Sequence, residues 1–302
     1  MYNILLMNTK HILLIVLIFI IIILIININI NIPNRESFTA KPKKIGLCFL
    51  IYDKINHEEL WYNWLKNVDK SKYNIYIHYK ENKPMKYFEQ YKLENCIPTK
   101  YADVSLIHAH NILFSAALND NCYKIVSLSQ ACIPLKSFYY VYDFLTKDNM
   151  GHFNVAKHDT CFPRCNNLLN YYNKANIQKS SNWFILNKEH CEIVTSVDTD
   201  TIDKKYKFTS PEEHYFITTI YDSNQQHNLI ETANLSADAT TFTGWNDMTN
   251  YKSFKDSKIT GAPNNYKYIC SEELTYLIQS KSLFGRKFLE NCGGLERLLE
   301  QL

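Results

Sequence analysis

Three short apolar segments, separated by helical patterns, constrain the fold of this chain more than any other feature. Residues 45–52, 73–79 and 123–128 are rich in β-branched and aromatic side chains and have the length of buried strands. Residues 105–118 form an apolar helical pattern, with Ser105 as the expected N-cap. This alternation predicts an α/β domain with a mostly parallel central sheet flanked by helices. Ligands of such sheets bind at the carboxyl ends of strands, so we expect the site in the loops that follow the three strands.

The composition excludes several classes of protein. The chain has 302 residues, of which 46% are hydrophobic, so it can bury a sizeable core. Its formal net charge of +3 is too small to indicate nucleic-acid binding. Nine cysteines occur without any C-x-x-C pair, which argues against a zinc site. Cys161 and Cys165 are the most closely spaced pair; in a lumenal domain we expect some cysteines to pair and at least one to stay reduced.

The N-terminal part of the chain reads as a membrane segment. Residues 12–26 form an unbroken apolar run, which alternating isoleucines extend to Ile32 before Pro33. A helix needs ~20 mostly apolar residues to cross ~30 Å of hydrocarbon. A cleaved signal peptide is the alternative, but the run is long for one and no A-x-A site follows it. We therefore expect a tail over 1–11, a transmembrane anchor over 12–32, a stem over 33–44 and a globular domain over 45–302.

The charges beside the anchor leave its orientation open. Lys10 and His11 precede the apolar run, whereas four cations follow it, at positions 35, 41, 43 and 44. The positive-inside rule alone would place the C-terminal domain in the cytoplasm.

Two acidic motifs are candidates for chemistry. Asp198-Thr199-Asp200 has the Asp-x-Asp pattern of a divalent-cation site, but it follows a helical segment and reads better as a solvated turn. Ser210-Pro211-Glu212-Glu213 precedes an apolar helical run and has the pattern of a capping box, in which Glu213 bonds back to the Ser210 amide. The alternative is that Glu213 faces a cleft and acts as a general base.

A basic motif and two tryptophans complete the candidates. Arg286 and Lys287 lie between Phe284 and Phe288, where they could clamp a diphosphate or form a solvated edge. Trp183 and Trp245 lie beside polar residues; such side chains stack on sugars, although a core position is more common.

Seven segments, taken in order, resemble the core-2/I-branching β-1,6-N-acetylglucosaminyltransferase family, which includes peptide-O-xylosyltransferases and a plant branch. They run from Lys44 to about Cys292 and comprise KIGLCFLIYDKINHEELW, YNIYIHYK, IPTKYADVSLIHAHNILFSAAL, YKIVSLSQACIPLKSF, SSNWFILNKEHCEIV, SPEEHYFITTI and SKSLFGRKF. Each segment alone is moderately specific, and the ordered set covers nearly the whole globular part.

The resemblance implies a GT-A-type fold, inverting chemistry without a metal or other cofactor, and type II topology with a lumenal catalytic domain. It matches Glu213 to the catalytic base and Lys287 to the basic residue that contacts the donor diphosphate. Arg286 or Lys267 is the expected second cation, and Trp245 matches an aromatic residue that packs on the acceptor sugar. One departure is Lys80, which stands where animal members often have an aspartate near the uridine.

The expected partners are a UDP-sugar, a glycan or glycoprotein acceptor, and the membrane, with no nucleic acid. The expected reaction transfers GlcNAc from UDP-GlcNAc in a β-1,6 linkage. The alternatives are a xylosyltransferase or other UDP-sugar transferase of the same fold, a metal-dependent transferase that uses Asp198 and Asp200, and a membrane-anchored glycan-binding protein without turnover. Asn234, in Asn-Leu-Ser, is the one N-glycosylation sequon and is expected to face the lumen.

Overall fold

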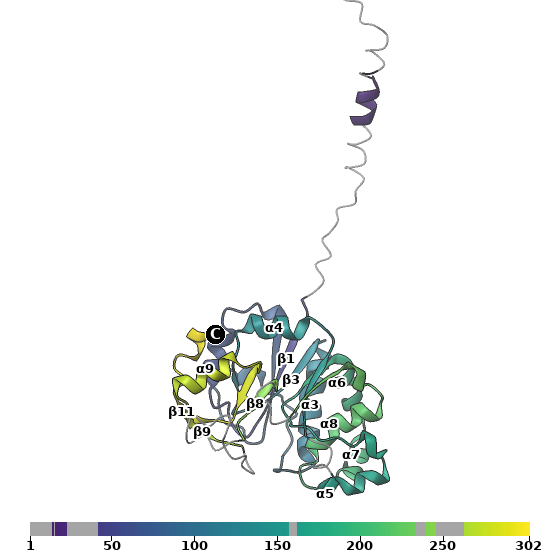
Figure 1. Ribbon diagram of the computed structural model, residues 1–302, viewed down its shortest axis with the longest axis vertical. Helices are drawn as coiled ribbons and strands as arrows, with labels where there is room; N and C mark the ends of the chain where they lie inside the picture. The colour runs from purple at the N-terminus through teal and green to yellow at the C-terminus, as the bar shows by residue number, and fades with distance from the viewer. Residues whose placement is uncertain (1–13, 15, 23–41, 157–161, 234–238, 246–262) are drawn as a thin grey trace, which may run out of the picture. The chain divides into compact units, whose positions relative to one another are not determined.

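A computed structural model describes residues 14, 16–22, 42–156, 162–233, 239–245 and 263–302 (Figure 1). The chain divides into two units, 1–42 and 43–302. In the first unit, residues 14 and 16–22 are helical and exposed. Within the described residues, no helix has both the length and the apolar character needed to cross a bilayer. Most of the predicted anchor over 12–32 lies outside those residues.

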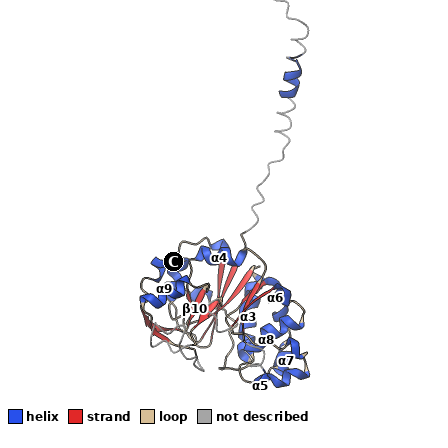
Figure 2. Ribbon diagram, in the orientation of Figure 1, coloured by secondary structure: helices blue, strands red, loops and turns tan. Residues whose placement is uncertain are grey.

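The second unit is built on a six-stranded mixed sheet with the order β2-β1-β3-β6-β5-β7 (Figure 2). Strand β1 pairs in parallel with β2 and β3, and β5 pairs in parallel with β7. Strand β6 is antiparallel to both of its neighbours, so the sheet is mixed; the other three strand pairs are parallel, which confirms the prediction of a mostly parallel sheet. The strands are β1 (Ile45–Ile51), β2 (Tyr73–Tyr79), β3 (Lys124–Ser129), β5 (Gly151–Val155), β6 (Ile185–Asn187) and β7 (Leu229–Ala233).

Two smaller sheets extend the unit. In one, β10 (Phe284–Arg286) lies between β4 (Ile133–Pro134) and β8 (Thr241–Thr243). In the other, β11 (Phe288–Gly293) pairs with β9 (Tyr266–Tyr268). The strand β10 therefore brings the C-terminal Phe-Gly-Arg-Lys-Phe motif next to the segment that follows β3.

Helices cover both faces of the central sheet. The α-helices are α2 (Glu58–Leu65), α3 (Ser105–Asn119), α4 (Phe138–Thr146), α5 (Phe162–Cys165), α6 (Lys188–Thr195), α7 (Thr199–Lys205), α8 (Glu212–Asp222), α9 (Ser271–Gln279) and α10 (Leu298–Gln301). Short 3-10 helices span Lys70–Lys72, Glu89–Tyr91, Asn166–Asn170, Lys174–Asn176 and Gln226–Asn228. Helices α3, α6 and α8 pack together on one side of the sheet (Figure 1).

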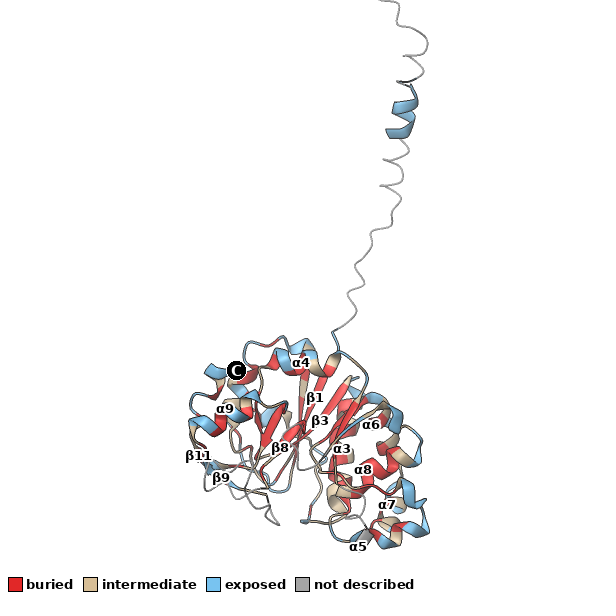
Figure 3. Ribbon diagram, viewed as in Figure 1, coloured by how far each residue is buried: buried red, intermediate tan, exposed pale blue. Residues whose placement is uncertain are grey.

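The alternation of side chains along the strands produces two cores, one on each face of the sheet. Leu47 and Phe49 of β1 pack with Trp61 of α2, whereas Cys48 between them packs with Phe114 of α3. The central strands are accordingly buried on both faces (Figure 3). Trp61 is fully buried, lies edge-on to Phe49 with 5.0 Å between ring centroids, and its indole N–H donates to the Cys132 carbonyl at 3.0 Å. The N–H therefore has the partner that a buried indole requires.

The three strands and the helix predicted over 105–118 are confirmed to within one residue at each end. The predicted capping of α3 is wrong, because Val104 is the N-cap and Ser105 is already helical. The Ser105 hydroxyl instead accepts a hydrogen bond from the Lys100 N–H at 2.9 Å, and the Ser105 N–H donates to Asp103 at 3.0 Å. These bonds hold the loop before α3 against the start of the helix.

Seven described cysteines carry free thiols, and three of them, Cys48, Cys122 and Cys191, lie in the same hydrophobic core. The thiols of Cys48, Cys96, Cys122, Cys132, Cys191, Cys270 and Cys292 are not in disulfide bonds. Burial raises the pKa of the Cys48 and Cys191 thiols, so both behave as small core side chains. Cys161 lies outside the described residues.

Candidate active site

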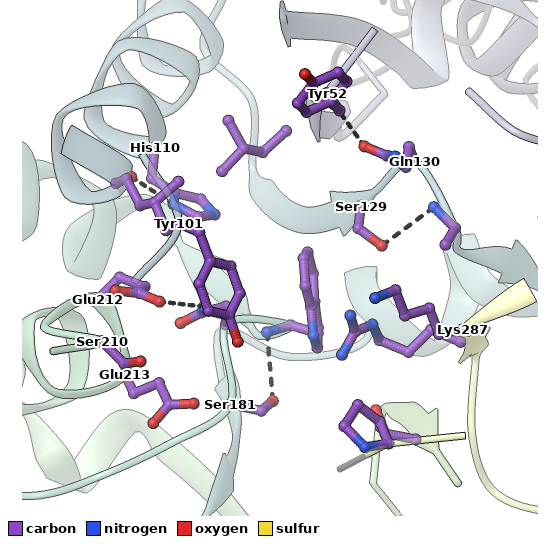
Figure 4. A pocket seen from close by; sticks show the side chains of 18 of the residues that line it. Tyr52, Tyr101, His110, Ser129, Gln130, Ser181, Ser210, Glu212, Glu213 and Lys287 are labelled. Carbon is purple, nitrogen blue, oxygen red and sulfur yellow. Dashed lines mark hydrogen bonds between the residues drawn. The ribbon is translucent and has the colours of Figure 1, made fainter. Parts of the chain in front are cut away.

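A cavity of about 670 Å³ opens where the parallel strands β1, β2 and β3 end (Figure 4). Tyr52, Lys80 and Ser129, which end or directly follow these three strands, line it. The three loops in which we expect a ligand site therefore line one cavity. Its volume is that of a pocket for a small molecule rather than for a single ion.

Gln130 ties two of these loops together. Its side-chain oxygen accepts a hydrogen bond from the Tyr52 N–H at 2.5 Å (Figure 4). Its backbone carbonyl accepts another from the Asn56 N–H at 2.9 Å. The polar stretch after β3 therefore fixes the rim of the cavity at the end of β1.

The turn before α8 differs from the capping box that the sequence predicts. Pro211 is the N-cap and no side chain caps the helix. The Ser210 N–H donates to the Ala102 carbonyl at 3.0 Å, and Ser210 (φ 57°) and Ala102 (φ 54°) both adopt the left-handed backbone conformation. The Ser210 amide is thus occupied by the loop before α3, and Glu213 does not bond back to it.

Glu213 lies in the first turn of α8 and lines the cavity. One oxygen, Oε2, is 3.4 Å from Arg164 Nη1 and 3.3 Å from Lys179 Nζ. The side chain is 29% exposed, so these are partly solvated ion pairs. The two cations stabilise an ionised carboxylate at the cavity wall.

Glu212, the preceding residue, has a different environment. It is 5% exposed, and its Oε1 accepts a hydrogen bond from the Asn182 amide at 3.3 Å. Its other oxygen is buried with no hydrogen-bond partner among the described residues. Burial raises the pKa of the Glu212 carboxyl to about 7. The two adjacent acids on α8 therefore present one partly exposed carboxylate, Glu213, and one buried carboxyl, Glu212, that is partly protonated near neutral pH.

Arg286 and Lys287 both line the cavity, and Lys287 lies across it from Glu213 (Figure 4). The Arg286 guanidinium lies over the Trp183 ring, 4.4 Å from its centroid. Burial lowers the pKa of Arg286, and burial and the neighbouring Arg286 together lower the pKa of Lys287. The flanking Phe284 and Phe288 are fully buried, so the core on either side holds this pair of cations in place.

The cavity brings together four of the five predicted site residues. Glu213, Arg286, Lys287 and Trp245 all line it. Lys267, the predicted alternative second cation, lies in β9 with an exposed side chain and is not among the lining residues. Arg286 is therefore the cation that accompanies Lys287 in this cavity.

The Asp-x-Asp motif lies elsewhere. Asp198 is the N-cap of α7, where it accepts hydrogen bonds from the Thr201 N–H at 2.8 Å and the Thr201 hydroxyl at 2.7 Å. Neither Asp198 nor Asp200 lines the cavity. Within the described ranges, no three His, Cys, Asp or Glu side chains are grouped so that they could share a metal ion.

Sequence reasoning missed Lys179 and Glu212, which line the cavity, and Arg164, which contacts Glu213 without lining the cavity. Arg164 and Lys179 belong to the stretch between β5 and β6 that shows no recognisable pattern. The sequence pattern places Glu212 in a capping turn. It favours a core position for Trp183, although the adjacent polar residue Asn182, which also lines the cavity, indicates a site.

The arrangement can accept a proton on one side and stabilise negative charge on the other. Glu213 supplies a carboxylate that faces the cavity, and Arg286 and Lys287 supply two fixed positive charges across it. Such preorganised charges act most strongly where water is partly excluded.

Comparison with known proteins agrees with this geometry. The sequence profile of the family described as Core-2/I-Branching enzyme matches residues 45–276, which is well over half of the chain. The chain is also similar to the rice (Oryza sativa subsp. japonica) protein named glycosyltransferase BC10, at 21% identity over 162 residues. That match covers 50% of this chain and 40% of the rice protein, so this chain spans less than half of its relative.

Proposed function

Because this chain belongs to the core-2/I-branching enzyme family, we propose that it is an inverting glycosyltransferase with a GT-A-type fold. The proposed donor is a UDP-sugar, with UDP-GlcNAc as the first choice, and the acceptor is a hydroxyl of a glycan or glycoprotein, joined in a β-1,6 linkage. The observation that carries the proposal is that Glu213 and Lys287 line one cavity from opposite sides, with Arg286 also in the lining.

The proposed reaction is a single displacement. Glu213 removes the proton from the acceptor hydroxyl, and that oxygen attacks the anomeric carbon of the donor sugar. The bond from this carbon to the diphosphate oxygen breaks as the new bond forms, which inverts the configuration. Lys287 and Arg286 stabilise the negative charge of the departing nucleoside diphosphate. A positioned carboxylate base of this kind contributes roughly 10²–10⁴-fold to the rate.

The proposed mechanism uses no metal. Two cations line the cavity in which we place the diphosphate, whereas Asp198 of the Asp-x-Asp motif, which a metal-dependent mechanism would use, caps α7. Lys287 is partly buried, so its ammonium acts in a medium where Coulomb attraction is stronger than in bulk water.

The test is a transfer and hydrolysis screen with several UDP-sugars on the wild type, Glu213→Gln and Lys287→Ala. We expect Glu213→Gln to lose transfer by at least ~10²-fold while it still binds UDP. We expect Lys287→Ala to bind UDP roughly ten- to a hundredfold more weakly, because a charge-assisted contact is worth ~1.5–3 kcal/mol. Calorimetry with UDP, and rates with and without EDTA or Mn²⁺, provide the measurements.

Two outcomes would contradict the proposal. Normal transfer by Glu213→Gln would show that another group is the base. If EDTA removes the activity and Mn²⁺ restores it, a metal ion rather than the cation pair stabilises the leaving diphosphate. Lys267→Ala is the matched control for Lys287→Ala, since Lys267 does not line the cavity, and its UDP affinity should equal that of the wild type.

A further inference from the structure

The cavity carries more positive charge than a nucleoside diphosphate requires. Among the described residues, its lining includes five cationic side chains and two acidic ones. The cations are Lys80, Lys100, Lys179, Arg286 and Lys287, and the acids are Glu212 and Glu213. The nearby His110 adds no charge at neutral pH, because burial lowers its pKa to about 4. A diphosphate bound at Arg286 and Lys287 would leave three lining cations and one partly exposed carboxylate, that of Glu213.

Part of this surplus lies beside Glu213, where Lys179 of the lining is joined by Arg164, which contacts Glu213 but is not itself a lining residue. Arg164 and Lys179 both contact the same carboxylate oxygen, so two positive charges share one negative charge. Their distances of 3.4 and 3.3 Å exceed the ~2.7–2.9 Å that is usual for a charge-assisted hydrogen bond. Glu213 therefore only partly satisfies the two cations. Arg164 is 50% exposed, which leaves part of its guanidinium open to a ligand.

Glu212 does not cancel this surplus. Its carboxyl is buried beside Asn182. The charge of Glu213 raises the pKa of this carboxyl, and the charge of Arg164 lowers it. With its pKa raised to about 7 by burial, it carries only part of a negative charge at neutral pH. The wall that would receive the acceptor is thus net positive even when Glu213 is ionised.

We infer that the acceptor carries an anionic group close to the reacting hydroxyl, and that Arg164 and Lys179 bind this group. This inference rests on the proposed function, because it takes the Glu213 side of the cavity as the acceptor side. The chemical class is a glycan that bears a carboxylate or a sulfate. Arginine suits either group, since its planar fork can donate two parallel hydrogen bonds to two oxygens.

The alternative role for the surplus, a second contact to the donor diphosphate, fits the geometry less well. Lys287 and Glu213 lie on opposite sides of the cavity (Figure 4). Arg164 and Lys179 contact the carboxylate on the Glu213 side. The positive charges of Arg164 and Lys179 would therefore lie beside the acceptor, because the acceptor must bring its hydroxyl to Glu213.

The test measures binding, so it does not depend on turnover. Lactose, 3′-sialyllactose and 3′-sulfolactose are titrated into UDP-loaded protein in a calorimeter, which compares one disaccharide without and with a carboxylate or sulfate. We expect the anionic sugars to bind about tenfold or more tightly than lactose at low salt, with the difference shrinking as salt is added. Tighter binding of only one of the two anionic sugars would show whether the acceptor's anionic group is a carboxylate or a sulfate.

Variants connect any preference to the two cations. Arg164→Gln and Lys179→Gln should each reduce it, and Arg164→Lys should keep part of it because the charge remains. Arg297→Gln removes the charge of an exposed arginine that, unlike Arg164, is not paired with Glu213 and, like it, does not line the cavity; this variant should bind like the wild type.

The inference is wrong if lactose and the anionic sugars bind equally, if none of them binds, or if the preference survives in both glutamine variants. The proposed function fails separately, through loss of UDP binding by the wild type or through transfer that does not need Glu213. A protein that transfers sugar to neutral acceptors without any preference would keep the function and lose this inference.

Discussion

Two adjacent glutamates on α8 differ in burial, and this difference has a consequence for stability. The unfolded chain ionises Glu212 near the ordinary value of 4.5, whereas the folded protein holds the pKa of this carboxyl at about 7. The unfolded state therefore binds fewer protons than the folded state between these values. This group's contribution to stability is fully present below pH 4.5, declines as the pH rises toward 7, and is flat above it.

We predict that Glu212→Gln is more stable than the wild type at pH 8. A rise of the pKa from 4.5 to about 7 corresponds to at most about 3 kcal/mol of unfolding free energy. Denaturant unfolding of both proteins at pH 4.5 and pH 8 checks this, and the variant's advantage should disappear at the lower pH. Glu300→Gln, which removes an exposed carboxylate on α10, is the control. An equal difference at both pH values would show that the burial of Glu212 carries no ionisation cost.

At the residue scale, the sequence predicted which residues carry the chemistry better than it predicted which residues they contact in the folded chain. Glu213, Arg286 and Lys287 were candidates because of their types and flanking residues, and the cavity contains all three. Arg164 could not be paired with Glu213 from the sequence, because 49 positions separate them and only the folded chain brings them together. The capping box also failed for a tertiary reason, since the Ser210 amide bonds to Ala102.

At the scale of elements, the starts of α3 and α8 are joined through two residues in the left-handed conformation. The carbonyl of Ala102 accepts the Ser210 N–H, and both residues have positive φ. A residue with a Cβ pays roughly 1 kcal/mol for this conformation, whereas glycine adopts it freely. The join sets the position of the first turn of α8, which carries Glu213.

We predict that Ala102→Gly raises the unfolding free energy by about 0.5–1 kcal/mol, because relief of the left-handed backbone outweighs the added freedom of the unfolded chain. Ala116→Gly, in the interior of the right-handed helix α3, should lower it by about 1 kcal/mol. Urea unfolding monitored by circular dichroism measures both. If both variants lose stability equally, the conformation of Ala102 is not a source of strain.

Elements with a strong local pattern were predictable, and those that depend on distant partners were not. The strands β1, β2 and β3 are continuous apolar runs, so their bounds followed from the residues themselves. The direction of β6 did not follow, because a three-residue strand has no feature that separates parallel from antiparallel pairing. The prediction of a mostly parallel sheet is confirmed, but the sequence does not indicate its one antiparallel member, β6.

At the scale of the whole molecule, the orientation of the proposed membrane anchor stays a prediction. We propose type II topology with the second unit, 43–302, in the lumen, against the count of cations at positions 35–44. In intact microsomes, we expect this unit to resist added protease and Asn234 to carry a glycan that Asn234→Gln removes. Asn234 lies outside the described residues. Digestion of the unit from the cytoplasmic side would reverse the proposed orientation.

The path of β1 has a practical consequence for handling the protein. This strand begins at Ile45, just after Lys43, whose ammonium donates to the Thr146 carbonyl at 2.7 Å. The strand then runs seven residues, or about 23 Å, to the rim of the cavity. A linker, affinity tag or resin joined ahead of Lys43 is thus attached near the amino end of β1, whereas the cavity lies at the carboxyl end of this strand. Immobilised by its amino end, the second unit should leave that mouth open to dissolved sugars, which makes this end the preferred handle for a solid-phase assay.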